Sequence, residues 1–166
     1  DHQVKIYEVE PGKHETRDLP PPMISDEFEF TRLVNPTRKS RSLKLEGNWG
    51  RNEDVTVPWY YDDVLIGRPG DKLTFTFRGT AVGVFCLNYN NGLKAEARVD
   101  GEEVAGPFTH YIVEFGTLTM LKHGMENREH MVELEVAKPM KAKNKLEDPT
   151  IRIAYLAIAT GRPEGK

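Results

Sequence analysis

The feature that most constrains the fold of this chain is a period-two alternation of apolar and polar residues. Leu73, Phe75 and Phe77 alternate with threonine and arginine, and the same pattern recurs over residues 93–99 and 132–136. Side chains of a strand point alternately to opposite faces of a sheet. The alternation therefore predicts strands with one buried face and one solvated face.

A continuous apolar run over residues 81–87 predicts a further strand, buried on both faces. Helical periodicity is confined to one short turn, predicted over residues 117–123 with Leu118 and Leu121 directed inward. The pattern rules give about ten strands. They are predicted over residues 4–9, 27–30, 43–45, 55–59, 73–78, 81–87, 93–99, 108–115, 132–136 and 151–159. The sequence thus predicts an all-β fold, a jelly-roll-like β-sandwich of two antiparallel sheets.

Turn and spacing residues separate these strands. An Asn-Asn-Gly sequence at residues 90–92, Asp100-Gly101 and an Arg-Pro-Gly-Asp sequence at residues 68–71 each supply the turn chemistry that the connections need. Gly79 directly follows one predicted strand and Gly83 lies within the next, and in both places the missing side chain permits a bulge or a close backbone approach.

The chain is predicted to have one folded domain flanked by two short segments. Residues 1–25 form an N-terminal strand and a proline-rich linker, in which three consecutive prolines at positions 20–22 favour polyproline II. Residues 26–161 form the β-sandwich, and residues 162–166 are a C-terminal tail. A lysine-rich stretch over residues 138–149 is predicted to be a solvated loop, with contact to an acidic polysaccharide as the alternative.

Composition excludes several classes of function. The net charge is −3, so the chain has no overall basic field with which to bind nucleic acid. It contains no apolar run long enough to span a membrane. Its single cysteine, Cys86, cannot form an intrachain disulfide, and its apolar neighbours predict a buried, inert thiol.

Familiar catalytic motifs are absent from the sequence. It has no phosphate-binding glycine loop, no zinc-protease motif and no nucleophile elbow. The five histidines show no spacing typical of metal ligands, although His130, at the start of a strand, can hydrogen-bond a neighbouring loop. A catalytic alternative requires acids such as Asp62 and Glu114 to converge in a groove of the sandwich.

A cluster of aromatic residues is the strongest candidate for a ligand site. Flat rings with a polar edge stack on the apolar faces of sugars and leave the rim free for hydrogen bonds. The predicted platform residues, with two amides as hydrogen-bonding partners, are Trp49, Trp59, Tyr60, Tyr61, Asn88 and Asn90. The competing interpretation is that these rings belong to the core.

No cofactor is predicted, apart from a structural calcium ion as an open alternative. Carboxylate and amide oxygens are the ligands that calcium prefers. Asp62 and Asp63, together with Asn88, Asn90 and Asn91, could supply them between loops. The simpler interpretation is ordinary turn polarity.

Three segments in order resemble a known family of domains. They are the stretch around Phe77 to Phe85, the hairpin at Val99-Asp100-Gly101, and the strand that starts at His130. This order resembles the jelly-roll, galactose-binding-like modules attached to SGNH/GDSL-type carbohydrate esterases. The resemblance implies a secreted or periplasmic setting and a carbohydrate or a catalytic esterase domain as partner. The chain carries no SGNH catalytic block.

The expected function is therefore that of a non-catalytic carbohydrate-binding or accessory module associated with such an esterase. Two alternatives remain open. One is a β-sandwich hydrolase acting on carbohydrate, and the other is a structural domain that binds protein.

Overall fold

The computed structural model describes residues 28, 30–38, 40–52, 63–87, 95–104, 116–137 and 150–161. Within these ranges the chain forms eleven strands and no helix, so the all-β prediction is confirmed. No helix of bilayer-spanning length and apolarity occurs among the described residues.

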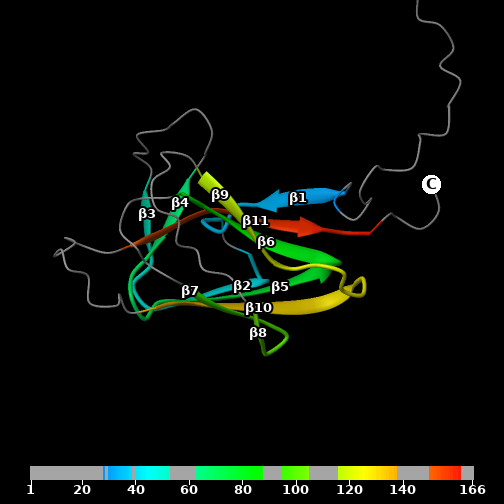
Figure 1. Cartoon of the computed structure of the whole chain (residues 1–166). Coiled ribbons are helices and arrows are strands. Elements are labelled where there is room, and N and C mark those ends of the chain that lie inside the picture. The colour runs from blue at the N-terminus through cyan, green and yellow to red at the C-terminus, as the bar shows by residue number, and fades with distance from the viewer. Residues whose placement is uncertain are drawn as a thin grey trace, which may run out of the picture.

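The strands form two antiparallel sheets packed face to face, as Figure 1 shows. The six-stranded sheet contains β1 (Thr31–Val34), β3 (Gly50–Asn52), β4 (Val64–Gly67), β6 (Ala81–Leu87), β9 (Gly116–Lys122) and β11 (Ile151–Ala159). The five-stranded sheet contains β2 (Leu43–Glu46), β5 (Lys72–Gly79), β7 (Ala95–Val99), β8 (Glu102–Val104) and β10 (Arg128–Val136). The order is β3-β4-β11-β6-β9 in the first sheet, with β1 also paired to β11, and β2-β5-β10-β7-β8 in the second.

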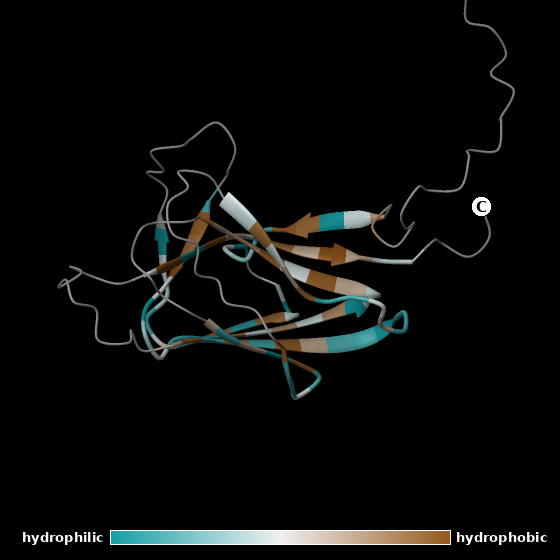
Figure 2. Cartoon of the chain, viewed as in Figure 1, coloured by the Kyte–Doolittle hydropathy of each residue, from teal (hydrophilic) through white to brown (hydrophobic). Residues whose placement is uncertain are grey.

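The core lies between the sheets and follows the alternation of the sequence. On β5, Leu73, Phe75 and Phe77 are buried while the residues between them are not, and β7 and β10 behave in the same way. β6 and β11 are buried along most of their length, as the continuous apolar runs predict. In Figure 2, β10 carries both hydrophilic and hydrophobic colours, whereas hydrophobic colours predominate along β11.

Two predicted turns are confirmed by their backbone geometry. Asp100 and Gly101 both have positive φ, 54° and 80°, which suits the tight hairpin between β7 and β8. Before β5, the Asp71 amide donates to the Arg68 carbonyl over 2.9 Å, and Gly70 supplies a φ of 92°.

Gly79 and Gly83 lie where a second element comes close, as predicted. A Cβ atom on Gly79 would collide with the carbonyl oxygen of Ala159 at the end of β11. A Cβ on Gly83 would lie 2.9 Å from the Met120 sulfur and 3.0 Å from the Thr119 carbonyl oxygen. Both positions therefore need glycine, because a side chain would clash with the neighbouring strand.

Two predictions about local structure are wrong. Residues 117–123 do not form a helical turn but belong mostly to β9, where Leu121 is buried and Leu118 is exposed. Phe28 and Phe30 lie in turns, and the strand begins only at Thr31. Thr31 is opposite Ala159, the last residue of β11, so the pairing of β1 with β11 ends at this point.

Several predicted elements lie outside the described residues. They are the strands at 4–9, 55–59 and 108–115, the turn at 90–92 and the lysine-rich loop at 138–149. The division into residues 1–25, 26–161 and 162–166 also stays a prediction.

Candidate functional site

The register of the strands brings several connections to one end of the sandwich. Leu87, the last residue of β6, pairs with Gly116 of β9 and with Arg152 of β11. In the other sheet, Val136 at the end of β10 pairs with Ala95 at the start of β7. Residues 88–94 and 138–149 are therefore bounded on both sides by strand ends at this end of the molecule. The predicted ligand residues Asn88 and Asn90 belong to the first of these connections.

Trp49 lies at the same end, between β2 and β3. Its indole N–H donates to the carbonyl oxygens of Glu46 and Lys72, over 3.1 and 3.0 Å. A Cβ on Gly67 would lie 2.5 Å from the six-membered ring of Trp49 and 3.0 Å from a methyl group of Val136. The half-buried ring thus packs over a glycine at the edge of the core. These contacts give Trp49 a packing role, and its role as a sugar platform stays a prediction.

The packing role of Trp49 predicts a loss of stability on truncation. We expect Trp49→Ala to lower the free energy of unfolding by about 2 kcal/mol, less than for a fully buried tryptophan because the ring is only half-buried. Trp49→Phe keeps a ring over Gly67 and should lose about 1 kcal/mol with the two hydrogen bonds. Urea denaturation followed by circular dichroism measures both. Wild-type stability in Trp49→Ala would contradict the packing role.

The other platform residues, Trp59, Tyr60, Tyr61, Asn88 and Asn90, lie outside the described residues. So do Asp62 and Glu114, the acids of the catalytic alternative. The paired residues Asn52 and Val64 lie on the two sides of the aromatic segment 53–62, on the edge strand β3 and its neighbour β4. The described structure therefore fixes where this segment leaves and rejoins the sheet.

A small polar cluster holds the point at which the aromatic segment rejoins the sheet. Asn35 donates through its side-chain amide to the Asp63 carbonyl oxygen over 3.2 Å. The Thr37 hydroxyl contacts the Asn35 side-chain oxygen at 2.7 Å and an Asp63 carboxylate oxygen at 3.3 Å. Asn35 and Thr37 are both buried, so their polar groups are satisfied inside the protein. The cluster positions Asp63, two residues after Tyr61, the last residue of the predicted aromatic platform.

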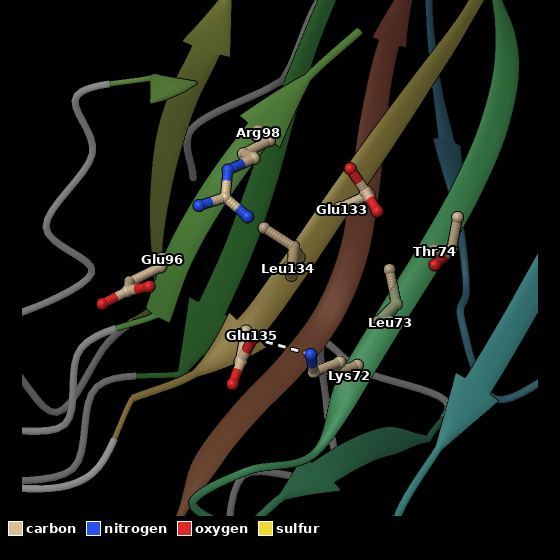
Figure 3. A pocket seen from close by; sticks show the side chains of 8 residues that line it. All are labelled: Lys72, Leu73, Thr74, Glu96, Arg98, Glu133, Leu134 and Glu135. Atoms are coloured by element: carbon tan, nitrogen blue, oxygen red, sulfur yellow. Dashed lines mark ion pairs between the residues drawn. The ribbon is translucent and has the colours of Figure 1, made fainter. Parts of the chain in front are cut away.

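The outer face of the five-stranded sheet carries a shallow polar depression of about 60 Å³ (Figure 3). It is lined by Lys72, Leu73, Thr74, Glu96, Arg98, Glu133, Leu134 and Glu135. The charged side chains form cross-strand rows, since Glu135 is opposite both Lys72 and Glu96 while Glu133 is opposite both Thr74 and Arg98. The alternation of the sequence marked these positions as outward-facing but did not show which of them share a row.

Electrostatic pairing orders part of this depression. The Lys72 ammonium lies 3.0 Å from a Glu135 carboxylate oxygen, and the hydrogen bond to Glu135 raises the pKa of Lys72. Carboxylate, ammonium and guanidinium groups together offer acceptors and donors to a hydroxyl-rich ligand. None of the eight lining residues is aromatic, so the depression provides no plane on which a sugar ring could stack.

The buried ring of His130 hydrogen-bonds the exposed turn residue Asp100. Its Nδ1 lies 2.7 Å from an Asp100 carboxylate oxygen, and its Nε2 lies 2.8 Å from the Glu126 carbonyl oxygen. The predicted hydrogen bond from His130 to a neighbouring loop is therefore confirmed. Because both ring nitrogens are engaged, the ring has no free nitrogen to act as a general base. The sequence had not indicated Asp100 as the partner.

The hydrogen bond to His130 also lowers the pKa of Asp100. A second contribution comes from the Met131 amide, which donates to the other carboxylate oxygen over 2.9 Å. Arg128 lies 3.3 Å from the same carboxylate. The cluster thus holds a charged carboxylate in the β7–β8 turn.

The thiol of Cys86 is buried in the core, as predicted. Burial raises its pKa to about 12, so the nucleophilic thiolate is scarce at neutral pH. No group of three or more histidine, cysteine or acidic side chains within the described ranges is placed to hold a metal ion. The residues of the calcium alternative lie outside those ranges, except Asp63, so that alternative stays untested.

Comparison with known proteins supports a fold-level relationship. No protein-family model and no curated protein matches the sequence. A two-domain esterase active on acetylated mannans superposes on 93% of this chain with a TM-score of 0.66 and 13% identity, and the match covers 43% of that esterase. A family two carbohydrate esterase from Cellvibrio japonicus superposes on 78% of the chain with a TM-score of 0.56 and 15% identity, covering 33% of that enzyme.

A separate carbohydrate-binding domain has the same architecture. The CBM36-1 domain of a multidomain xylanase from the hindgut metagenome of Trinervitermes trinervoides is 18% identical, with a TM-score of 0.50. The match covers 80% of this chain and 98% of that domain. The chain therefore has the jelly-roll β-sandwich fold found in carbohydrate esterases and in carbohydrate-binding domains. It spans less than half the length of the esterases that it matches.

Proposed function

We propose that this chain is a non-catalytic accessory domain of a carbohydrate esterase and that it binds carbohydrate. The observation that carries the proposal is the extent of the superposition with the mannan esterase. Nearly the whole chain, 93% of it, corresponds to less than half of a two-domain enzyme. The chain therefore has the size of one of the two domains of such an enzyme, and the rest of the enzyme is large enough to be the catalytic domain.

The chemistry of the described residues supports a non-catalytic role. His130 and Cys86 are two side chains in those ranges with the chemistry of a general base or a nucleophile. His130 has both ring nitrogens hydrogen-bonded, and Cys86 is buried with a raised pKa. Neither is available to attack or deprotonate a substrate.

The proposed ligand surface is the end of the sandwich at which residues 88–94 leave the strands. We propose that Asn88 and Asn90 contribute to it together with the aromatic residues Trp59, Tyr60 and Tyr61. Trp49, which packs over Gly67, lies at this end of the described structure. The polar rows beside Lys72 and Glu135 begin at the strand ends nearby and offer further hydrogen bonds to a polysaccharide. Because plant-type polysaccharides lie outside the cell, we also propose a secreted or periplasmic setting.

Binding to a polysaccharide tests this proposal directly. We expect the chain to be retarded by soluble acetylated mannan or xylan in affinity gel electrophoresis. Removal of one stacking ring in Trp59→Ala should weaken binding about 10-fold, the equivalent of roughly 1.4 kcal/mol. Phe28→Ala is the matched control, since Phe28 is an exposed ring that is not among the proposed ligand residues, and its loss should leave binding unchanged.

Two results would contradict the proposal. One is the absence of retardation by either polysaccharide. The other is hydrolysis of acetylated polysaccharide by the chain alone, which would favour the catalytic alternative.

A further inference from the structure

The outer face of the six-stranded sheet carries a groove lined almost entirely by apolar side chains. The groove has a volume of about 270 Å³ and is lined by Phe28, Thr31, Leu118, Met120, Ala157 and Ala159. Among these side chains only Thr31 has a polar atom, and its hydroxyl already donates to the Phe28 carbonyl oxygen over 2.8 Å. An outward sheet face is ordinarily polar, as it is on the other sheet at Lys72 and Glu135.

The groove has a floor of small residues and walls of large ones. Ala157 and Ala159 belong to β11, in the interior of the sheet, and Gly83 is opposite Ala157 on β6. Met120 and Leu118 on β9 lie across Gly83, as the short distances from a Cβ on that glycine show. The shape suits insertion of an apolar side chain from another protein surface.

Three large side chains at this face are exposed. Leu33 is 60% exposed and is opposite Ala157, on the same face of β1 as Thr31, while Phe28 and Leu118 are each 45% exposed. Contiguous exposed apolar surface marks interaction sites in proteins. A sugar is a poor occupant, because its hydroxyl groups would lose hydrogen bonds to water without gaining partners.

The two points at which the chain enters and leaves the sandwich lie beside this groove. The Thr160 amide donates to the Phe30 carbonyl oxygen over 3.0 Å, and the Thr160 hydroxyl contacts the same oxygen at 3.2 Å. Figure 1 shows the start of β1 next to the end of β11. A domain joined covalently at either point would be held near the groove at a high effective concentration.

We infer that this face is the docking surface for a second folded domain of the same polypeptide. The inference rests on the proposed function, which makes that domain the catalytic domain of an esterase. An apolar side chain of the catalytic domain occupies the groove, with Leu33 and Leu118 at its margin. Two linked domains move relative to each other unless their interface is large and hydrophobic, so an apolar contact at this face would restrict that motion.

Cysteine labelling tests the docking surface. Because Cys86 is buried, single cysteines introduced by Leu33→Cys and Leu118→Cys report on the groove alone, and Glu96→Cys on the opposite sheet is the matched control. Each is made in the 166-residue chain and in the complete polypeptide that the gene encodes. We expect maleimide to react with the two groove cysteines at least about 10-fold more slowly in the complete polypeptide, and with the control at the same rate in both.

Every other outcome overturns the inference. Equal labelling of the groove cysteines in the two proteins means that the face stays open. Slow labelling of the groove cysteines already in the 166-residue chain means that something else covers the face. If light scattering gives a dimer, the cover is a second copy of the chain. If it gives a monomer, the cover is residues 1–27. The inference is also excluded if the gene encodes no second domain. Because labelling requires no carbohydrate, the docking and the carbohydrate-binding proposals fail separately.

Discussion

The Gly79→Ala variant is expected to lose about 3 kcal/mol in its free energy of unfolding, the cost of forcing an extra methyl group into a closed contact. The added Cβ would collide with the carbonyl oxygen of Ala159 and lie 3.0 Å from a methyl group of Ile158. That carbonyl cannot move aside freely, because it accepts the Thr80 amide over 2.8 Å. Urea denaturation followed by circular dichroism measures the loss.

Gly50→Ala is the matched control for this prediction. Gly50 also lies on a strand, but a Cβ there meets nothing closer than 3.8 Å, from Ile66. We expect the control to stay within about 0.5 kcal/mol of the wild type or to be slightly more stable, because alanine restricts the unfolded chain. Equal losses in the two variants would mean that the strands do not approach closely at Gly79.

The core strands were predictable because their alternation matches a simple two-layer fold. The buried residues of β5 and β10 follow the period-two pattern residue by residue. Asp100-Gly101 was predictable as a turn because both residues tolerate positive φ. In each case a short stretch of sequence contains the whole physical reason.

The predictions failed where the six-stranded sheet is apolar on its outer face. On β9, Leu118 points outward over Gly83 while Leu121 points into the core, as residues of opposite parity on a strand do. Because apolar residues therefore lie on both faces, the polar positions do not mark the outer face, and the three-residue spacing of the two leucines resembles a helix. The short strand β4 was missed because it is buried and apolar throughout most of its length, with no alternation. The same outward apolar residues that obscure the pattern form the docking surface proposed above.

The candidate site could be predicted only as a set of residue types. The packing of Trp49 over Gly67 depends on a contact between residues 18 positions apart, and that between His130 and Asp100 on residues 30 apart. Such contacts follow from strand register, which no local pattern specifies. The sequence indicates which side chains have the right chemistry, and the register decides which of them meet.

The pair formed by Asp100 and His130 predicts a stability that depends on pH. The pKa of Asp100 is lowered from its ordinary value of 3.8, so its charged form is favoured by folding. The resulting stabilisation is complete above the ordinary carboxyl range, and it is lost as the pH falls through about 4 toward the lower pKa of the folded state. Asp100→Asn removes the charge but retains a residue that tolerates the φ of 54°.

We therefore expect Asp100→Asn to be about 2 kcal/mol less stable than the wild type at pH 6, the usual contribution of hydrogen bonds to a charged group, and the difference to shrink as the pH falls below the ordinary carboxyl range. Glu96→Gln changes an exposed residue of β7, the strand that leads into the Asp100 turn. Its free energy of unfolding should differ little from that of the wild type, and the difference should vary little with pH. Urea denaturation at a series of pH values measures all three proteins. A difference for Asp100→Asn that is constant between pH 2 and pH 6 would mean that the carboxylate gains nothing from His130 and the Met131 amide.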